Sequence, residues 1–278
     1  MRFPRRDAQR TEPIAISEAE LDAMTADLDE MHHASMPALR DAVDELKQLH
    51  ADVRAQAGGL SNTLANRRQF LLGSGVVLGG LALAACSSSS KSSSPTTSPQ
   101  TTATGGDSGK LTGDLAIVAL AAGLENLAVG MYQAGIDAAT AGKLGAVPPA
   151  VVTFAKTAQT HHKAHASAWN GVLKAAGERP VTGVDTTVKT GVVDPAFAKV
   201  TDVSGLAKLA LELEDVAAAT YLGGIGAIES NAGIKTAASI QPVEMQHAAI
   251  LNFVLGQYPV PDAFAQTAGA RSTSDMIG

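Results

Sequence analysis

Residues 124–132 read LENLAVGMY, and residues 213–221 read LEDVAAATY. Both stretches place a glutamate after a leucine, continue with small and apolar residues, and end on a tyrosine seven residues after the glutamate. Seven residues are about two turns of an α-helix, so the glutamate and the tyrosine of each copy would lie on one helix face. This self-similarity indicates an internal duplication.

A second pair of related segments lies downstream of each copy. Residues 159–165 read QTHHKAH, and residues 244–250 read EMQHAAI. Gln159 and His162 have the same spacing as Glu244 and His247, and residues three apart project from one face of a helix. Each half of the duplication is therefore expected to be a pair of helices.

The limits of these helices follow from proline and glycine. We expect helices at residues 113–141, 149–176, 204–230 and 234–257. Pro148 and Pro149 mark the turn into the second helix, and Gly177 with Pro180 marks its end. About 27 residues separate the second and third helices, too many for a tight hairpin. The pattern predicts an all-α antiparallel four-helix bundle with one long crossover between helices 2 and 3.

Composition narrows the classes of partner. The 278-residue chain has a net charge of −6, and its globular part has no basic stripe, which argues against a nucleic-acid partner. Alanine, glycine, valine and leucine outweigh aromatic residues, which suits closely packed helices and argues against an all-β fold. Cys86 is the only cysteine, so the chain has no internal disulfide.

Residues 112–258 resemble the ferritin-like superfamily, in particular the exported bacterial ferritin-like domains of the desiccation-related type. The resemblance rests on one ordered set along the four helices: Glu125, Gln159 with His162, Glu214, and Glu244 with His247. It implies a carboxylate-bridged two-metal centre, which takes one glutamate from each of two helices and Glu-x-x-His from each of the others. The metal ligands expected from it are Glu125, His162, Glu214, Glu244 and His247.

Iron is the metal that this resemblance implies, as a two-iron centre, with manganese or zinc as alternatives. The sequence departs from the pattern at Gln159, where a bridging glutamate would stand. A neutral amide is a poor bridge and leaves three carboxylates instead of four. His165 lies one turn beyond His162 and could compensate, so Gln159 and His165 are further candidate ligands. His161 is expected to point off this face and to be exposed.

Aromatic residues would lie close to these ligands. Tyr132 and Tyr221 are expected near the centre, where they could hydrogen-bond to the ligands or carry an electron. Packing tyrosines with satisfied hydroxyl groups are the alternative. Trp169 is expected in the core, whereas Glu212 and Asp215 are expected to be solvated.

Residues 66–86 read NRRQFLLGSGVVLGGLALAAC, which is a basic segment followed by a short apolar run and small residues. Arg67 and Arg68 with the following QFLL resemble a twin-arginine export signal, and LAAC at 83–86 resembles a lipobox. The resemblance implies export by the twin-arginine machinery and a lipid on Cys86 that anchors the protein to the outer face of the cytoplasmic membrane. A signal anchor with a chance cysteine is the alternative.

Residues 87–111, rich in Ser, Thr and Pro, are predicted to be a flexible tether, and residues 259–278 a loose tail.

Residues 1–65 form an unusually long segment before the arginine pair and are predicted to be a helical extension. Ser17 and Glu20 form a capping box. Apolar residues recur at heptad-like spacing before and after Pro37, which predicts a helical hairpin in the cytoplasm. A start at Val53 or Leu60 is the alternative and would leave an ordinary short signal. The stretch MHHASM at 31–36 could bind a soft metal, but such residues on one short exposed helix are more often incidental.

Two functional classes follow from these features. The first is an anchored ferritin-like protein that handles metal or consumes oxidant in the cell envelope, as a ferroxidase-like oxidoreductase. The second is a metal-free bundle with a structural or protein-interaction role under stress. A carboxylate-bridged oxygenase is a minor alternative. A lipid anchor argues against a closed ferritin shell of many subunits. A homodimer is compatible with the sequence.

Overall fold

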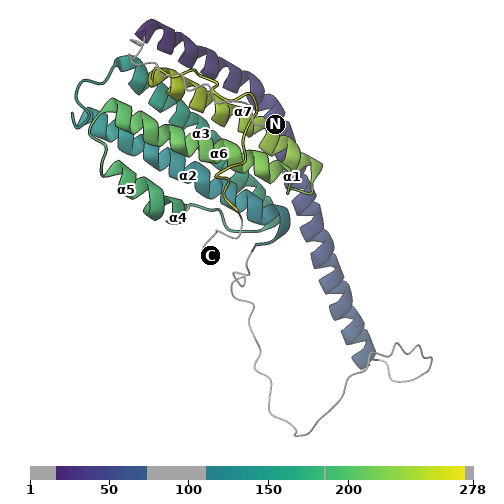
Figure 1. The fold of residues 1–278 in the computed structure, drawn as a ribbon. Helices are drawn as coiled ribbons and strands as arrows, with labels where there is room; N and C mark the ends of the chain where they lie inside the picture. The colour runs from purple at the N-terminus through teal and green to yellow at the C-terminus, as the bar shows by residue number, and fades with distance from the viewer. Residues whose placement is uncertain (1–16, 74–110, 185, 273–278) are drawn as a thin grey trace, which may run out of the picture. The chain divides into compact units, whose positions relative to one another are not determined.

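The computed structural model describes residues 17–73, 111–184 and 186–272 (Figure 1). These residues form helices and connecting segments without a strand. The elements are α1 (Glu18–Gly73), α2 (Gly113–Thr140), α3 (Pro149–Ala176), α4 (Thr186–Val188), the π-helix η1 (Lys189–Val193), α5 (Asp194–Phe197), α6 (Val203–Ile225) and α7 (Asn231–Val254). The all-α class predicted from the sequence is confirmed.

Helices α2, α3, α6 and α7 form a four-helix bundle. α2 packs most extensively against α3, and α6 against α7, while smaller contacts join α2 to α6 and α3 to α7. Two of the helix ends show clear caps. Gly177 ends α3 in the left-handed conformation at φ 87°, and the side chain of Asp202 accepts a hydrogen bond from the backbone of Gly205 at the start of α6. The two predicted helix pairs are confirmed, although α6 ends at Ile225, before the predicted residue 230.

The long crossover between α3 and α6 is present, and it contains short helices that the sequence analysis did not predict. It contains the short elements α4, η1 and α5, and it buries Val188 and Val193 against the bundle. These two valines explain the path of the crossover, because burying them requires the connection to lie along the helices instead of looping out.

Helix α1 is one continuous helix, so the predicted hairpin is wrong. Pro37 lies inside it. Proline removes one backbone donor from a helix, but apolar side chains on both sides of Pro37, such as Leu28 and Leu46, bury in the core clusters of the bundle. A break at Pro37 would disrupt that shared apolar face. The backbone N–H of Glu20 donates to Oγ of Ser17 over 3.3 Å, so this half of the predicted capping box is present.

Residues 18–54 of α1 belong to the same compact unit as the bundle, and the rest of α1 belongs to a second unit. Cys86 and the tether lie outside the described residues, as does most of the export signal. Among the helices searched, α2 alone is long and apolar enough to cross a membrane, but 72% of its most apolar window is buried inside the bundle. A helix buried in the core of a packed bundle passes the same test of length and hydropathy.

Candidate metal centre

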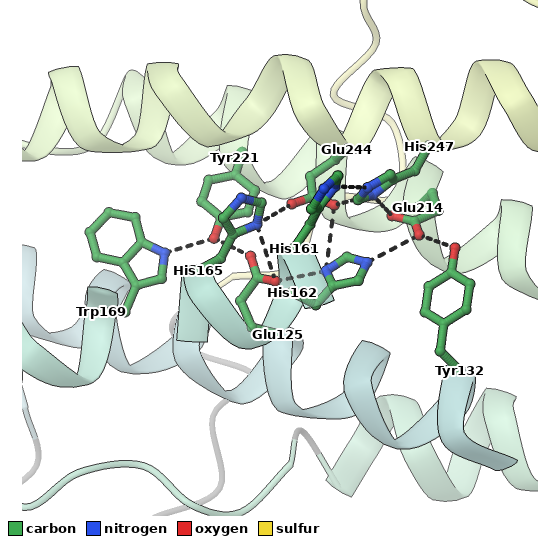
Figure 2. Close-up of polar contacts among 10 residues, drawn as sticks. All are labelled: Glu125, Tyr132, His161, His162, His165, Trp169, Glu214, Tyr221, Glu244 and His247. Carbon is green, nitrogen blue, oxygen red and sulfur yellow. Dashed lines mark hydrogen bonds and ion pairs between the residues drawn. The ribbon is translucent and has the colours of Figure 1, made fainter. Parts of the chain in front are cut away.

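The middle of the bundle holds a cluster of carboxylates and imidazoles, drawn in Figure 2. Its six members come from all four bundle helices, and none of their side chains is more than 2% exposed. They are Glu125 of α2, His162 and His165 of α3, Glu214 of α6, and Glu244 and His247 of α7. Charged groups at this depth are costly to bury unless they are paired or bind a metal.

The six side chains form two overlapping groups, each of which could hold one metal ion. One group is Glu125, His162, His165 and Glu244, and the other is His162, Glu214, Glu244 and His247. Within each group the ligand atoms lie within 4.8 Å of one another. His162 and Glu244 belong to both groups, so they are the two side chains that connect the sites.

Short contacts join the two ring nitrogens of His162 to two different glutamates. Nδ1 of His162 lies 2.8 Å from Oε2 of Glu125, and Nε2 lies 3.1 Å from Oε1 of Glu214. The carboxylate of Glu244 is divided in the same way. Its Oε1 lies 3.0 Å from Nδ1 of His165, and its Oε2 lies 3.3 Å from Nδ1 of His247.

The two tyrosines cross between the halves of the duplication. The hydroxyl of Tyr132 donates to Glu214 over 2.5 Å, and the hydroxyl of Tyr221 donates to Glu125 over 2.5 Å. Nε1 of Trp169, which is buried, donates to the hydroxyl of Tyr221 over 2.7 Å. Each half therefore orients the glutamate of the other half, and the tyrosines lie directly behind two candidate ligands.

Gln159 lies outside the cluster. Its amide nitrogen donates to Gln133 and to the carbonyl of Val129, and its oxygen accepts from Lys163. The structure therefore corrects the register of the repeat. His162 corresponds to Glu244 and His165 to His247, so the sequence HKAH at 162–165 matches EMQH at 244–247. The imidazole of His162 occupies the place that the sequence analysis gave to Gln159.

His161 is fully buried, so its predicted exposure is wrong. Nδ1 of His161 lies 3.1 Å from Nε2 of His247, and its Nε2 lies 3.1 Å from the carboxylate of Asp29 on α1. The ring of His32, also on α1, stacks on His161 with centroids 3.8 Å apart. The sequence analysis did not relate α1 to the bundle; the pair of histidines in MHHASM was the feature that could have indicated it. Asp29 and His32 of α1 therefore hold His161, which in turn contacts the candidate ligand His247.

Charge pairing shifts the pKa values in this centre. Burial alone would lower the pKa of His165, but the nearby charges of Glu125 and Glu244 raise it from 6.5 to about 9. For the same kind of reason, Glu214 and Glu244 outweigh burial and hold the pKa of His162 well above 6.5. Burial would raise the pKa of Glu125, but His165 and His162 lower it from 4.5 to about 2. Carboxylates and imidazoliums therefore coexist in the metal-free chain.

His161 and His32 behave in the opposite way. Burial, reinforced by the neighbouring His247 and His32, lowers the pKa of His161 to about 2. Burial and the charge of His165 lower the pKa of His32 to about 4. Both rings are neutral at pH 7.

The residues fit a metal pair. Several polar atoms of the cluster have no hydrogen-bond partner although they are buried: both ring nitrogens of His165, Oε2 of Glu214 and Oε1 of Glu244. Nδ1 of His165 is close to Oε1 of Glu244, but the contact is not aligned as a hydrogen bond. Buried polar atoms without a partner are rare in folded proteins. Three of these atoms, Nδ1 of His165, Oε1 of Glu244 and Oε2 of Glu214, lie beside other members of the cluster. Carboxylate oxygens and imidazole nitrogens suit iron, manganese or zinc.

Comparison with known proteins gives one match. Residues 113–257, more than half of the chain, match the model of the family described as the ferritin-like domain. No significant match was found among curated proteins or among solved structures. The matched segment begins at the first residue of α2 and ends just beyond α7, so it covers the bundle and excludes α1.

Proposed function

Because the chain belongs to the ferritin-like domain family, we propose that its buried centre binds two divalent metal ions, with iron as the metal. The observation that carries this proposal is the pair of overlapping ligand groups, which share His162 and Glu244. A hydrogen-bonded structural network would not need two equivalent sets of four donors. Each set here contains two carboxylates and two imidazoles, a donor set that matches first-row divalent metals.

The proposed activity is the handling of metal or the consumption of oxidant. When bound, a pair of ferrous ions supplies electrons that can reduce O₂ or peroxide. The chain contributes the surroundings. Glu125 and Glu214 are held by the tyrosine hydroxyls, and the buried rings around them exclude water. These contacts fix the donors before metal arrives, which lowers the reorganisation needed for binding.

A small pocket lies beside the centre. Its lining includes Glu125, His162 and Val188 of α4, and its remaining lining residues are apolar. A small neutral oxidant could pass such a lining, whereas a large organic substrate would not fit. This supports a metal-centred oxidase over the carboxylate-bridged oxygenase.

The cell envelope is the proposed location. The support is the sequence of residues 66–86, in which Arg67 and Arg68 precede an apolar run that ends at Cys86. Export by the twin-arginine machinery and lipidation of Cys86 would hold the bundle on the outer face of the cytoplasmic membrane. In that position it would meet oxidants before they reach the cytoplasm.

The alternative is a metal-free structural bundle, and one observation favours it. The pKa values of three buried histidines, His162, His165 and His247, are raised, so three imidazoliums can balance the three buried carboxylates. The centre could then persist as a hydrogen-bonded network that defines the fold.

Oxidation of Fe(II) separates the two functions. We expect the full-length chain to accelerate aerobic oxidation of added Fe(II), measured as the decrease of the Fe(II) that ferrozine detects and as O₂ uptake. Glu244→Gln should lower this rate at least tenfold, because Glu244 belongs to both ligand groups. Glu212→Gln is the matched control, since Glu212 is exposed on α6 and should leave the rate unchanged. Equal rates for the wild type and Glu244→Gln would favour the structural bundle.

A further inference from the structure

We infer that His162 is a bridging ligand that coordinates one metal ion through Nδ1 and the other through Nε2. The inference rests on the proposed function and specifies how the two sites are joined. In the two-metal centres of helix bundles, the connecting ligands are glutamates of Glu-x-x-His motifs. This chain keeps one such glutamate, Glu244, and has an imidazole in the other place.

The two nitrogens of His162 face different ligand groups. Nδ1 lies 2.8 Å from Glu125, which belongs only to the first group, and Nε2 lies 3.1 Å from Glu214, which belongs only to the second. Figure 2 shows the ring between these two carboxylates. A carboxylate accepts but does not donate hydrogen bonds, so in the metal-free chain the ring donates an N–H to each glutamate. Two metal ions would replace these two protons.

Glu244 has the same divided geometry from the opposite half of the duplication. Its Oε1 is nearest to His165 of the first group, and its Oε2 is nearest to His247 of the second. In the repeat, Glu244 takes the position of His162, and His247 takes the position of His165. Each site would receive two oxygens and two nitrogens, from one terminal glutamate, one terminal histidine and the two bridges.

This arrangement also balances the positive charge that would remain with three carboxylates instead of four. A ring that coordinates through both nitrogens is an imidazolate anion. Together with Glu125, Glu214 and Glu244 it supplies four negative charges, which balance two divalent cations in a site that water does not reach. Gln159 is then not needed, in agreement with its hydrogen bonds to residues outside the centre.

Cadmium NMR tests the bridge directly. The full-length chain with Cys86→Ser, which removes the only thiol, is loaded with ¹¹³Cd(II) after removal of other metals. We expect two cadmium resonances of equal intensity. The ring protons of His162, assigned from the spectrum of His162→Gln, should couple to both resonances. The rings of His165 and His247 should couple to one resonance each, and not to the same one.

Stoichiometry in variants gives a second readout. His162→Gln should lower bound cadmium from two ions per chain to one, whereas His162→Glu should retain two, because a carboxylate can take the bridging place. Glu212→Gln, on the exposed surface of α6, is the control and should bind two.

The outcomes separate the two levels of the argument. Two bound cadmium ions with His162 coupled to only one of them would overturn the bridge and leave the proposed two-metal function standing. A chain that binds no cadmium, zinc or ferrous iron would overturn both.

Discussion

At the scale of single residues, the centre combines histidines whose pKa values move in opposite directions. His165 has a pKa of about 9 in the folded chain, so it stabilises the fold below pH 6.5 and loses that contribution as the pH rises through 9. His32 and His161, with pKa values of about 4 and about 2, are buried as neutral rings. The unfolded chain takes up protons at these rings below pH 6.5, so they destabilise the fold as the pH falls. Glu125 adds a further loss between 4.5 and about 2.

We therefore predict that the metal-free chain is most stable near pH 6.5. Differential scanning calorimetry of chelator-treated protein between pH 4 and 9 should show a melting temperature that falls on both sides of this value. His165→Gln should make the alkaline side less steep, because His165 is one of three buried histidines whose pKa is raised. A melting temperature that stays constant from pH 6.5 to 9 would contradict the charge pairing described for His165.

The sequence identified the members of the centre better than their roles. Glu125, Glu214, Glu244 and His247 could be predicted because each falls in a repeated motif whose spacing fixes its helix face. The role of His162 could not. The loop between the first two helices is longer than its counterpart in the second half, so spacing alone did not fix the register between QTHHKAH and EMQHAAI. Only the packed structure shows that His162 lies opposite Glu244.

At the scale of elements, α1 is the part of the fold that the family match does not include. Leu21, Leu28 and Leu46 are almost fully buried among bundle side chains, and Asp29 and His32 reach His161. A start at Val53 or Leu60 would delete all of these contacts. This packing supports the interpretation that residues 18–54 are part of the same folded unit as the bundle.

Removing one buried side chain of α1 tests its packing. We predict that Leu28→Ala destabilises the chain by roughly 2–5 kcal/mol, the range for truncating a fully buried leucine, measured by urea unfolding. Met31→Ala on the same helix is the control, because Met31 is about half exposed and should change stability by less than about 0.5 kcal/mol. Equal stabilities for Leu28→Ala and the wild type would show that α1 does not pack on the bundle in solution.

Element prediction succeeded where periodicity was strong and failed where long-range packing decides. The bundle helices were predicted with nearly correct limits, because apolar spacing, proline and glycine agree there. At Pro37 the local rule predicted a break, but the apolar face that α1 shares with the bundle keeps the helix continuous. The short helices of the crossover could not be predicted either, because they form where Val188 and Val193 meet the core.

At the scale of the whole molecule, two related helix pairs form one symmetric centre, and the proposed lipid anchor would fix that centre at a membrane. Cleavage before Cys86 would also separate α1 from the bundle in the covalent chain. After such a cleavage, the contacts of Asp29 and His32 with His161 would depend on non-covalent packing alone.

The anchor is tested by a substitution at Cys86. We predict that Cys86→Ser shifts the protein from the membrane fraction to the soluble fraction and abolishes its labelling by palmitate, because the thiol is the proposed site of the lipid. Ser87→Ala, next to it, should remain in the membrane fraction. Membrane retention of Cys86→Ser would instead support the signal anchor with a chance cysteine.

The central claim is that one chain holds two divalent metal ions in the buried centre. Anaerobic titration of the full-length, metal-free chain with Fe(II), with bound iron counted by elemental analysis after desalting, tests it most directly. The two overlapping ligand groups predict two iron ions per chain, and Glu244→Gln should bind fewer. A wild-type chain that retains no iron, and no zinc or manganese under the same conditions, would contradict the claim.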